Sequence, residues 1–194
     1  MTRQILILQG HPDPQGGHFC HALADAYRDG AESTGHTVTV VEVARLDFPL
    51  LRTKADFDTG EVPSALREAQ AAIGRADHLV LVYPLWLGTM PALLKGFLEQ
   101  VLRPGFATSK VTDGRHWQRL LTGKSARVVI TMGMPAFVYR WYFRAHSLKS
   151  LERNVLAFCG IGPIRDSLIG LVDANPARRT KWLDRLHALG RRGR

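Results

Sequence analysis

The feature that most constrains this chain is the regular alternation of short apolar segments with longer segments of helical periodicity. Five apolar, β-branched runs are expected as strands, at residues 4–8, 37–43, 78–83, 126–132 and 164–171. Apolar residues at helical spacing follow each run, in segments that start near residues 19, 63, 91, 148 and 176. Strands that alternate with helices predict an α/β protein with a parallel sheet covered on both faces. The length fits one domain, residues 1–194, ending in a basic helix and tail at 175–194.

Proline, glycine and asparagine mark where these elements begin and end. Asn175-Pro176 predicts a helix start, because asparagine caps free backbone amides and proline suits the first turn. Residues 44–61 show no periodicity and are expected to be irregular. Residues 103–124 are expected to form a long loop, a kind of segment that is usually functional or mobile in a compact domain.

The chain carries a net charge of +9, and much of this charge lies near the end of the sequence. Residues 173–194 contain seven Lys or Arg and two Asp, a local charge of +5. Such a segment suits a solvated helix, an attraction for phosphorylated cofactors, or a nucleic-acid surface. No zinc finger, aromatic RNA-binding motif or obvious recognition helix is present, so we predict no nucleic-acid partner.

Cysteine content and hydropathy limit the classes of protein further. Cys20 and Cys159 form neither a C-x-x-C pair nor a metal-ligand spacing, so we predict no metal site and a reducing, cytoplasmic location. No apolar run approaches the roughly 18 residues that a membrane-spanning helix needs. Neither Gly-x-Ser-x-Gly nor a pair of carboxylates indicates a hydrolase.

Parallel sheets bind ligands beyond the carboxyl ends of their strands, which directs attention to the loops after the first, third and fourth strands. The first of these loops, residues 9–18, leads into a helix start, where backbone amides are unpaired. With Gly17, His11 and His18 it forms a candidate phosphate cradle. A purely structural Gly/Pro turn is an equal alternative, because the loop matches neither Walker A nor Gly-x-Gly-x-x-Gly.

The loops after the third and fourth strands are apolar, although loops are usually polar. Residues 83–91 place aromatic and aliphatic groups beside a helix start, an arrangement that matches a flat ring with an apolar face and a polar edge. The alternative is that Trp86 and Leu87 lie in the core or in a subunit interface. Residues 131–137 carry no charge and are expected to face the other two loops.

One segment resembles a known family. Tyr83-Pro84-Leu85-Trp86, continuing through residues 90–97, resembles the flavin-contacting segment of the NAD(P)H:quinone oxidoreductase family of flavodoxin-like proteins, as do Gly10-His11-Pro12 and residues 19–23. That family includes the ancillary subunits of glutathione-gated potassium efflux systems. The resemblance implies a flavodoxin-like three-layer sandwich with strand order 2-1-3-4-5. It also implies FMN or FAD, a homodimer with active sites near the subunit boundary, and ping-pong transfer from NADH or NADPH to a quinone.

The resemblance assigns individual residues to the flavin. Those at the flavin phosphate are His11, His18, Phe19 and Cys20. Those on the isoalloxazine ring are Pro84, Leu85, Trp86 and Leu87, and those on a second flavin loop are Thr131, Met132 and Gly133. Tyr139 and His146 are implied near the flavin edge as a catalytic pair. The chain departs from the family in three places. Two are the segments Gly16-Gly17-His18 and Met132-Gly133-Met134-Pro135. The third is the spacing between Tyr139 and His146, which differs by one residue from the family pattern.

These residues predict a mechanism and leave two rival functions. Donors at the pyrimidine edge of the ring, the Gly133 amide among them, stabilise the charge that hydride transfer leaves there. His146 is a candidate proton donor, because imidazole exchanges protons near neutrality, or else a surface side chain. The rivals are a one-electron carrier, which is usually acidic, and a regulatory subunit of a membrane transporter. The sequence does not decide between FMN and FAD, or between NADH and NADPH.

Overall fold

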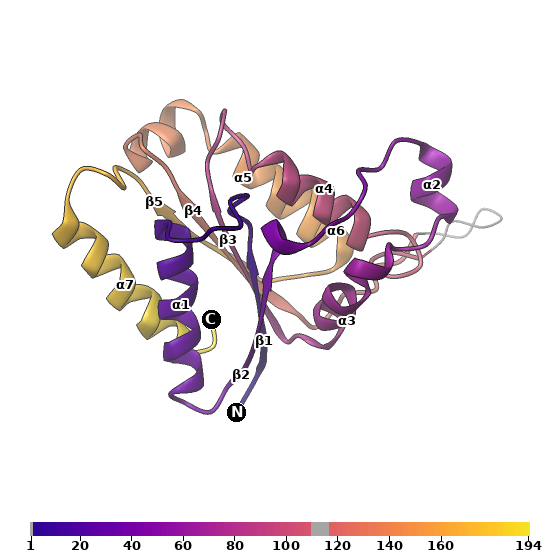
Figure 1. The fold of residues 1–194 in the computed structure, drawn as a ribbon, viewed down its shortest axis with the longest axis horizontal. Coiled ribbons are helices and arrows are strands. Elements are labelled where there is room, and N and C mark those ends of the chain that lie inside the picture. Colours follow the sequence, from indigo (N-terminus) through magenta and orange to yellow (C-terminus); the bar gives the residue numbers. More distant parts are fainter. Residues whose placement is uncertain (1, 110–116) are drawn as a thin grey trace.

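The computed structural model describes residues 2–109 and 117–194, and a five-stranded parallel sheet forms its centre (Figure 1). The strands are β1 (Gln4–Gln9), β2 (Thr37–Glu42), β3 (His78–Pro84), β4 (Ser125–Thr131) and β5 (Ile164–Ile169). Their order is β2-β1-β3-β4-β5, and all neighbouring pairs are parallel. This confirms the predicted α/β class, strand order and flavodoxin-like architecture. Every residue of β3 is buried, as its continuous apolar sequence predicts.

Helices cover both faces of this sheet, because alternate strand residues point to opposite sides. Ile5, Ile7, Val80 and Val82 pack under α1 (Phe19–Glu32) and α7 (Pro176–Gly190), which lie side by side in Figure 1. The opposite face is covered mainly by α3 (Arg67–Arg75), α4 (Ala92–Val101), α5 (His146–Ser150) and α6 (Ala157–Cys159). Shorter or irregular helical turns are η1 (Val43–Arg45), η2 (Ser64–Leu66), η3 (Val138–Tyr142) and η4 (Leu151–Leu156).

The two covering helices α1 and α7 cross at unusually close range. A β-carbon on Gly30 would lie 2.1 Å from the carbonyl oxygen of His187, and one on Gly190 would lie 2.0 Å from that of Tyr27. Glycine is therefore required on both sides of the crossing. The start of α7 matches the sequence prediction, because the Asn175 side chain accepts a 2.9 Å hydrogen bond from the Ala177 amide.

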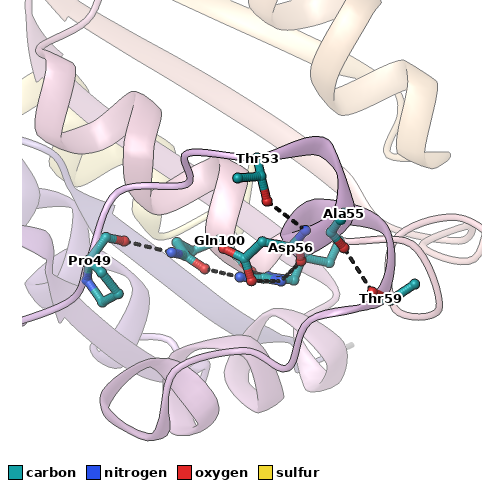
Figure 2. A network of polar contacts seen from close by, with 7 residues as sticks. Pro49, Thr53, Ala55, Asp56, Thr59 and Gln100 are labelled. Carbon is teal, nitrogen blue, oxygen red and sulfur yellow. Dashed lines mark hydrogen bonds and ion pairs between the residues drawn. The ribbon is translucent and has the colours of Figure 1, made fainter.

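The prediction of irregular structure for residues 44–61 was wrong in part, because helix α2 (Lys54–Thr59) forms there. Thr53 caps this helix by accepting a 3.0 Å bond from the Asp56 amide. The buried Arg103 side chain donates to the Asp56 carbonyl and to the side-chain oxygen of Gln100. Gln100 in turn donates to the Pro49 carbonyl at 2.5 Å, as Figure 2 shows. Residues about 50 positions away in the sequence hold this helix in place, and such contacts cannot be detected from local periodicity.

The predicted loop 103–124 is described only in part, because residues 110–116 lie outside the described ranges. Its described ends are held together by two hydrogen bonds between Ser109 and Gln118, each 2.9 Å long. In the described part of the chain, we find no helix that is long and apolar enough to cross a membrane.

Candidate functional site

Three loops meet at the carboxyl edge of the sheet, as the sequence predicts. The Leu85 amide donates to the Thr131 carbonyl at 2.7 Å, which joins the loop after β3 to the end of β4. The Cys20 sulfur lies 3.1 Å from the Thr131 hydroxyl, which joins the start of α1 to the same point. The rings of His11 and Trp86 lie 5.8 Å apart, edge to face. Segments 10–20, 84–91 and 131–137 therefore form one contiguous site.

The first loop is held in shape by its own hydrogen bonds around Asp13. The Asp13 carboxylate accepts from the Gln15 amide at 2.9 Å and from His18 Nε2 at 2.7 Å. The bond from His18 is the largest cause that lowers the pKa of Asp13. Gly16 and Gly17 have φ angles of +76° and +77°, a conformation that side chains other than glycine rarely adopt. The loop thus has a defined path into α1.

His11 is a neutral hydrogen-bond donor inside this loop. Its ring is buried and stacks on the His18 ring with 3.8 Å between centroids. Burial, together with the nearby His18 and His21, lowers the pKa of His11 to about 4. Nδ1 of His11 accepts a 3.2 Å bond from the Asp13 amide, so we assign the ring proton to Nε2. Nε2 is then free to donate to a ligand.

The start of α1 completes an anion cradle. Among the described residues no protein group accepts from the amides of Phe19 and Cys20, and His18 provides no side-chain cap. Free amides at a helix start attract anions. The Arg179 guanidinium lies 4.7 Å from the centre of the Phe19 ring and adds a positive charge. In the sequence, only its place in a basic segment distinguishes Arg179.

The loop after β3 is a tight turn that presents apolar groups to the outside. Trp86 and Thr89 exchange two backbone hydrogen bonds of 2.9 and 3.0 Å. Leu87 and Gly88 between them have φ angles of +45° and +79°. The Leu87 side chain is fully exposed and that of Trp86 is half exposed, whereas Pro84 is buried. Trp86 and Leu87 therefore do not lie in the core of this chain, and a ligand or a second subunit remains to cover them.

The loop after β4 offers one free backbone amide beside open space. The Met132 amide is bound to the Ile169 carbonyl at 2.9 Å, and Thr131 and Met132 are buried. Gly133 is exposed, and a β-carbon on it would meet no atom within 4 Å. Its amide has no protein acceptor in the part of the chain that the structure describes. Gly133 thus leaves room for a flat group to approach the backbone.

The predicted catalytic residues lie in different environments. Tyr139, in η3, is buried, and its hydroxyl lies 2.7 Å from Ser147 Oγ and accepts a 3.0 Å bond from the Leu148 amide. His146 is exposed at the first position of α5. The Tyr139 hydroxyl is therefore engaged with the start of α5, where it fixes the neighbour of His146. The roles of both residues in catalysis stay predictions.

One further polar group lies at the site, although no sequence motif marks it. Gln9 ends β1 and is buried, and its Oε1 accepts a 2.9 Å bond from the His11 amide. Its Nε2 has no partner among residues 2–109 and 117–194. A buried amide donor without a partner costs free energy unless a ligand or water completes it. The only signal in the sequence was a polar residue at the end of an apolar strand.

A cavity of about 570 Å³ lies elsewhere, between α2, α4 and α6. Trp117, Phe158 and Cys159 contribute to its wall, together with Lys95 and Leu98 of α4. None of its lining residues belongs to the three loops, so we do not assign this cavity to the same ligand.

Comparison with known proteins identifies relatives over almost the whole chain. Residues 3–189 match the family model described as flavodoxin-like fold. An uncharacterised NAD(P)H oxidoreductase of Haemophilus influenzae is 30% identical over 85% of this chain and 82% of its own length. An FMN-dependent NADH:quinone oxidoreductase of Nitratidesulfovibrio vulgaris is 27% identical over 93% and 94%. The structure of an NAD(P)H:quinone oxidoreductase from Methanothermobacter marburgensis is similar with a TM-score of 0.83, at 25% identity over 98% of each chain.

Proposed function

This chain belongs to the flavodoxin-like family of NAD(P)H:quinone oxidoreductases, and from that premise we propose that it uses FMN to pass two electrons from NADH or NADPH to a quinone. The observation that carries the proposal is the meeting of three loops at the carboxyl edge of the sheet, with a cradle for an anion on one side and open apolar groups on the other. The FMN-dependent relative supports FMN as the flavin.

The residues present fit such a cofactor. A phosphate would be held by the free amides of Phe19 and Cys20 and by His11 Nε2, with Arg179 as counter-charge. The turn at Trp86 and Leu87 would contact the ring system from its exposed apolar side. The space beside Gly133, which any side chain at that position would restrict, suits a planar group.

When bound, the flavin supplies the hydride chemistry, and the chain supplies position and hydrogen bonds. We propose that the Gly133 amide donates to the ring edge on which negative charge develops, because it is free for that purpose. His146 would transfer a proton from its imidazole to the reduced acceptor, and Tyr139 would position it through Ser147. A single open apolar face would take the nicotinamide and the quinone in turn, which is a ping-pong sequence.

A homodimer is part of this proposal. Leu87 on the ring-contacting turn is fully exposed, and Trp141 and Tyr142 on η3 are more than three-quarters exposed. Exposed apolar groups of this size commonly mark an interface. A second copy of the chain at this position would close the open side of the flavin site.

The visible spectrum of the purified protein tests the proposed function. FMN is added where needed, and NADH or NADPH is then added without oxygen. Flavin bands that bleach within seconds and recover when a quinone is added would support the reductase. Bands that stay oxidised would contradict it and favour an electron carrier or a regulatory subunit of a transporter. Failure to bind FMN or FAD would contradict the assignment of the three loops.

Replacement of His11 with leucine is expected to weaken FMN binding roughly tenfold or more, because it removes a donor to a charged phosphate, worth about 1.5–3 kcal/mol. The dissociation constant is measured by titrating the apoprotein with FMN and following flavin fluorescence. His36→Leu serves as the control, since His36 lies at the amino edge of the sheet, bound to the Arg3 amide. Equal affinities for the two variants would exclude His11 from the cradle.

Replacement of His146 with glutamine is expected to reduce steady-state quinone turnover by about 10² or more, the scale of general acid catalysis, while FMN stays bound. Stopped-flow measurements separate the two half-reactions. The oxidative half-reaction should slow and the reductive half-reaction should not. Unchanged turnover would remove His146 from the mechanism.

A further inference from the structure

The face of the sheet under α7 carries three arginines away from the flavin loops. Arg127 on β4 and Arg165 on β5 are direct partners in the strand register, so both side chains leave the same face of the sheet. Arg185 lies on α7, which covers this face, and its guanidinium stacks on the Trp182 ring at 4.8 Å. Like charges directly opposite each other on neighbouring strands destabilise a sheet. Arg165 and Arg185 are exposed to solvent, whereas Arg127 is buried, so a negative charge would stabilise this group most beside Arg127.

Arg127 is the buried member of this group, with 4% of its surface exposed. Its Nη1 donates to Ser167 Oγ at 2.9 Å, and its Nε has no partner among the described residues. Burial lowers the pKa of Arg127, and the charges of Arg165 and Arg185 lower it further, whereas Tyr27 and Asp166 act in the opposite direction. The positive charges of Arg165 and Arg185 thus add to the cost of keeping the buried Arg127 charged.

The described residues provide no acid that neutralises this group. Within residues 2–109 and 117–194, no carboxylate oxygen lies within 4 Å of a guanidinium nitrogen of Arg127, Arg165 or Arg185. Asp166 is next to Arg165 in sequence, but it points to the other face of the sheet, where it pairs with Arg140. The Tyr27 hydroxyl and His78 Nε2, on the same face as Arg127, are also buried and have no partner in the described part of the chain.

We propose that Arg127, Arg165 and Arg185 form a binding site for a phosphate-class oxyanion. The planar fork of arginine donors matches phosphate oxygens, and a divalent anion would neutralise the repulsion between the paired side chains. The site is distinct from the flavin cradle. Arg127 lies four residues before Thr131, which is roughly 13 Å along an extended strand, in the amino-terminal half of β4. The anion is either free phosphate or the phosphate group of a larger molecule.

Thermal unfolding of the FMN-loaded protein tests this site, because the flavin phosphate then occupies the cradle. Inorganic phosphate at 10 times its dissociation constant should raise Tm by about 4 °C above a chloride buffer of equal ionic strength. Arg165→Gln and Arg185→Gln should each lose this phosphate-specific rise. Lys181→Gln, at an exposed position on the same helix, should keep it. In chloride alone, Arg165→Gln should unfold at no lower temperature than the wild type, since it removes the paired repulsion.

The sources of the anion are separated by comparing phosphate with AMP and adenosine. A larger rise in Tm with AMP than with phosphate or adenosine indicates the phosphate group of a nucleotide. An equal rise in Tm with AMP and phosphate indicates phosphate alone. An equal rise in phosphate and chloride, or a rise that Arg165→Gln and Arg185→Gln retain, would overturn the proposal. Visible absorbance in the same samples reports flavin retention. NAD(P)H-dependent bleaching should be unchanged in both variants, so failure of the proposed reductase would be seen independently.

Discussion

Substitution of alanine for Gly190 is expected to lower the free energy of unfolding by about 3 kcal/mol or more, the upper range for overpacking at a rigid contact. The added β-carbon would lie 2.0 Å from the carbonyl oxygen of Tyr27 on α1, far inside van der Waals contact. A backbone oxygen in the middle of a helix cannot turn aside, so α7 must shift away from α1. That shift would also disturb the reciprocal approach of Gly30 to the His187 carbonyl.

The matched control for this substitution is Gly74→Ala. Gly74 is an exposed residue within α3, and the nearest atom to a new β-carbon would be 3.5 Å away. Alanine there should stabilise the protein by about 1 kcal/mol, because it reduces the freedom of the unfolded chain and favours helix. Urea denaturation measures both variants. If Gly190→Ala is as stable as Gly74→Ala, the close crossing of α1 and α7 does not exist in solution.

A marked loss of stability in mild acid is the second large effect that we expect, and His78 is one of its main sources. His78 is buried, with Nδ1 2.8 Å from Ser125 Oγ. Burial lowers its pKa from 6.5 to about 3, and the charges of Arg127 and Arg3 contribute to the shift. Between these two pKa values the unfolded chain binds more protons than the folded one, so stability falls as the pH falls. The loss from pH 7 to pH 5 should be about 2 kcal/mol.

The variant His78→Asn tests this source of acid sensitivity. Asparagine keeps a polar atom near Ser125 and has no group that titrates in this range. Urea midpoints at pH 7 and pH 5 should show that the variant, although less stable at pH 7, loses about 2 kcal/mol less on acidification than the wild type. A further loss of similar size should remain, because the pKa of His11 is also lowered, to about 4, and that of His21 is lowered as well. Equal losses in both proteins would show that His78 is not the residue responsible.

The architecture was predictable because its signals are local. The continuous apolar sequence of β3 predicts a strand buried on both faces, and Asn175-Pro176 predicts the start of α7. Parallel strands with right-handed crossovers leave few topologies, so the order of elements implied a sheet of this kind. Helix α2 was missed because Arg103 and Gln100, about 50 residues away, hold it in place.

The site was predictable in its location and less so in its details. The carboxyl edge of a parallel sheet brings together loops that follow different strands, so segments 10–20, 84–91 and 131–137 were expected to meet. Gln9 was missed because a polar residue at the end of an apolar strand is a weak signal, and Arg179 because its contact with Phe19 depends on how α7 lies beside α1. The family resemblance placed Tyr139 near the flavin edge, which stays a prediction, and the structure adds that its hydroxyl lies 2.7 Å from Ser147 Oγ.

By itself, the sequence determined the class of fold, the parallel strand order through its family resemblance, and which loops meet at the carboxyl edge of the sheet. Periodicity, capping residues and loop composition act over a few residues, so they can be recognised in the sequence before the fold is known. Only the tertiary structure decided that Arg127 and Arg165 are partners, that Gly30 and Gly190 face each other's helix, and that His78 is buried without charge. Strand register and helix crossing are set by the packing of the whole core, which no short segment of sequence encodes.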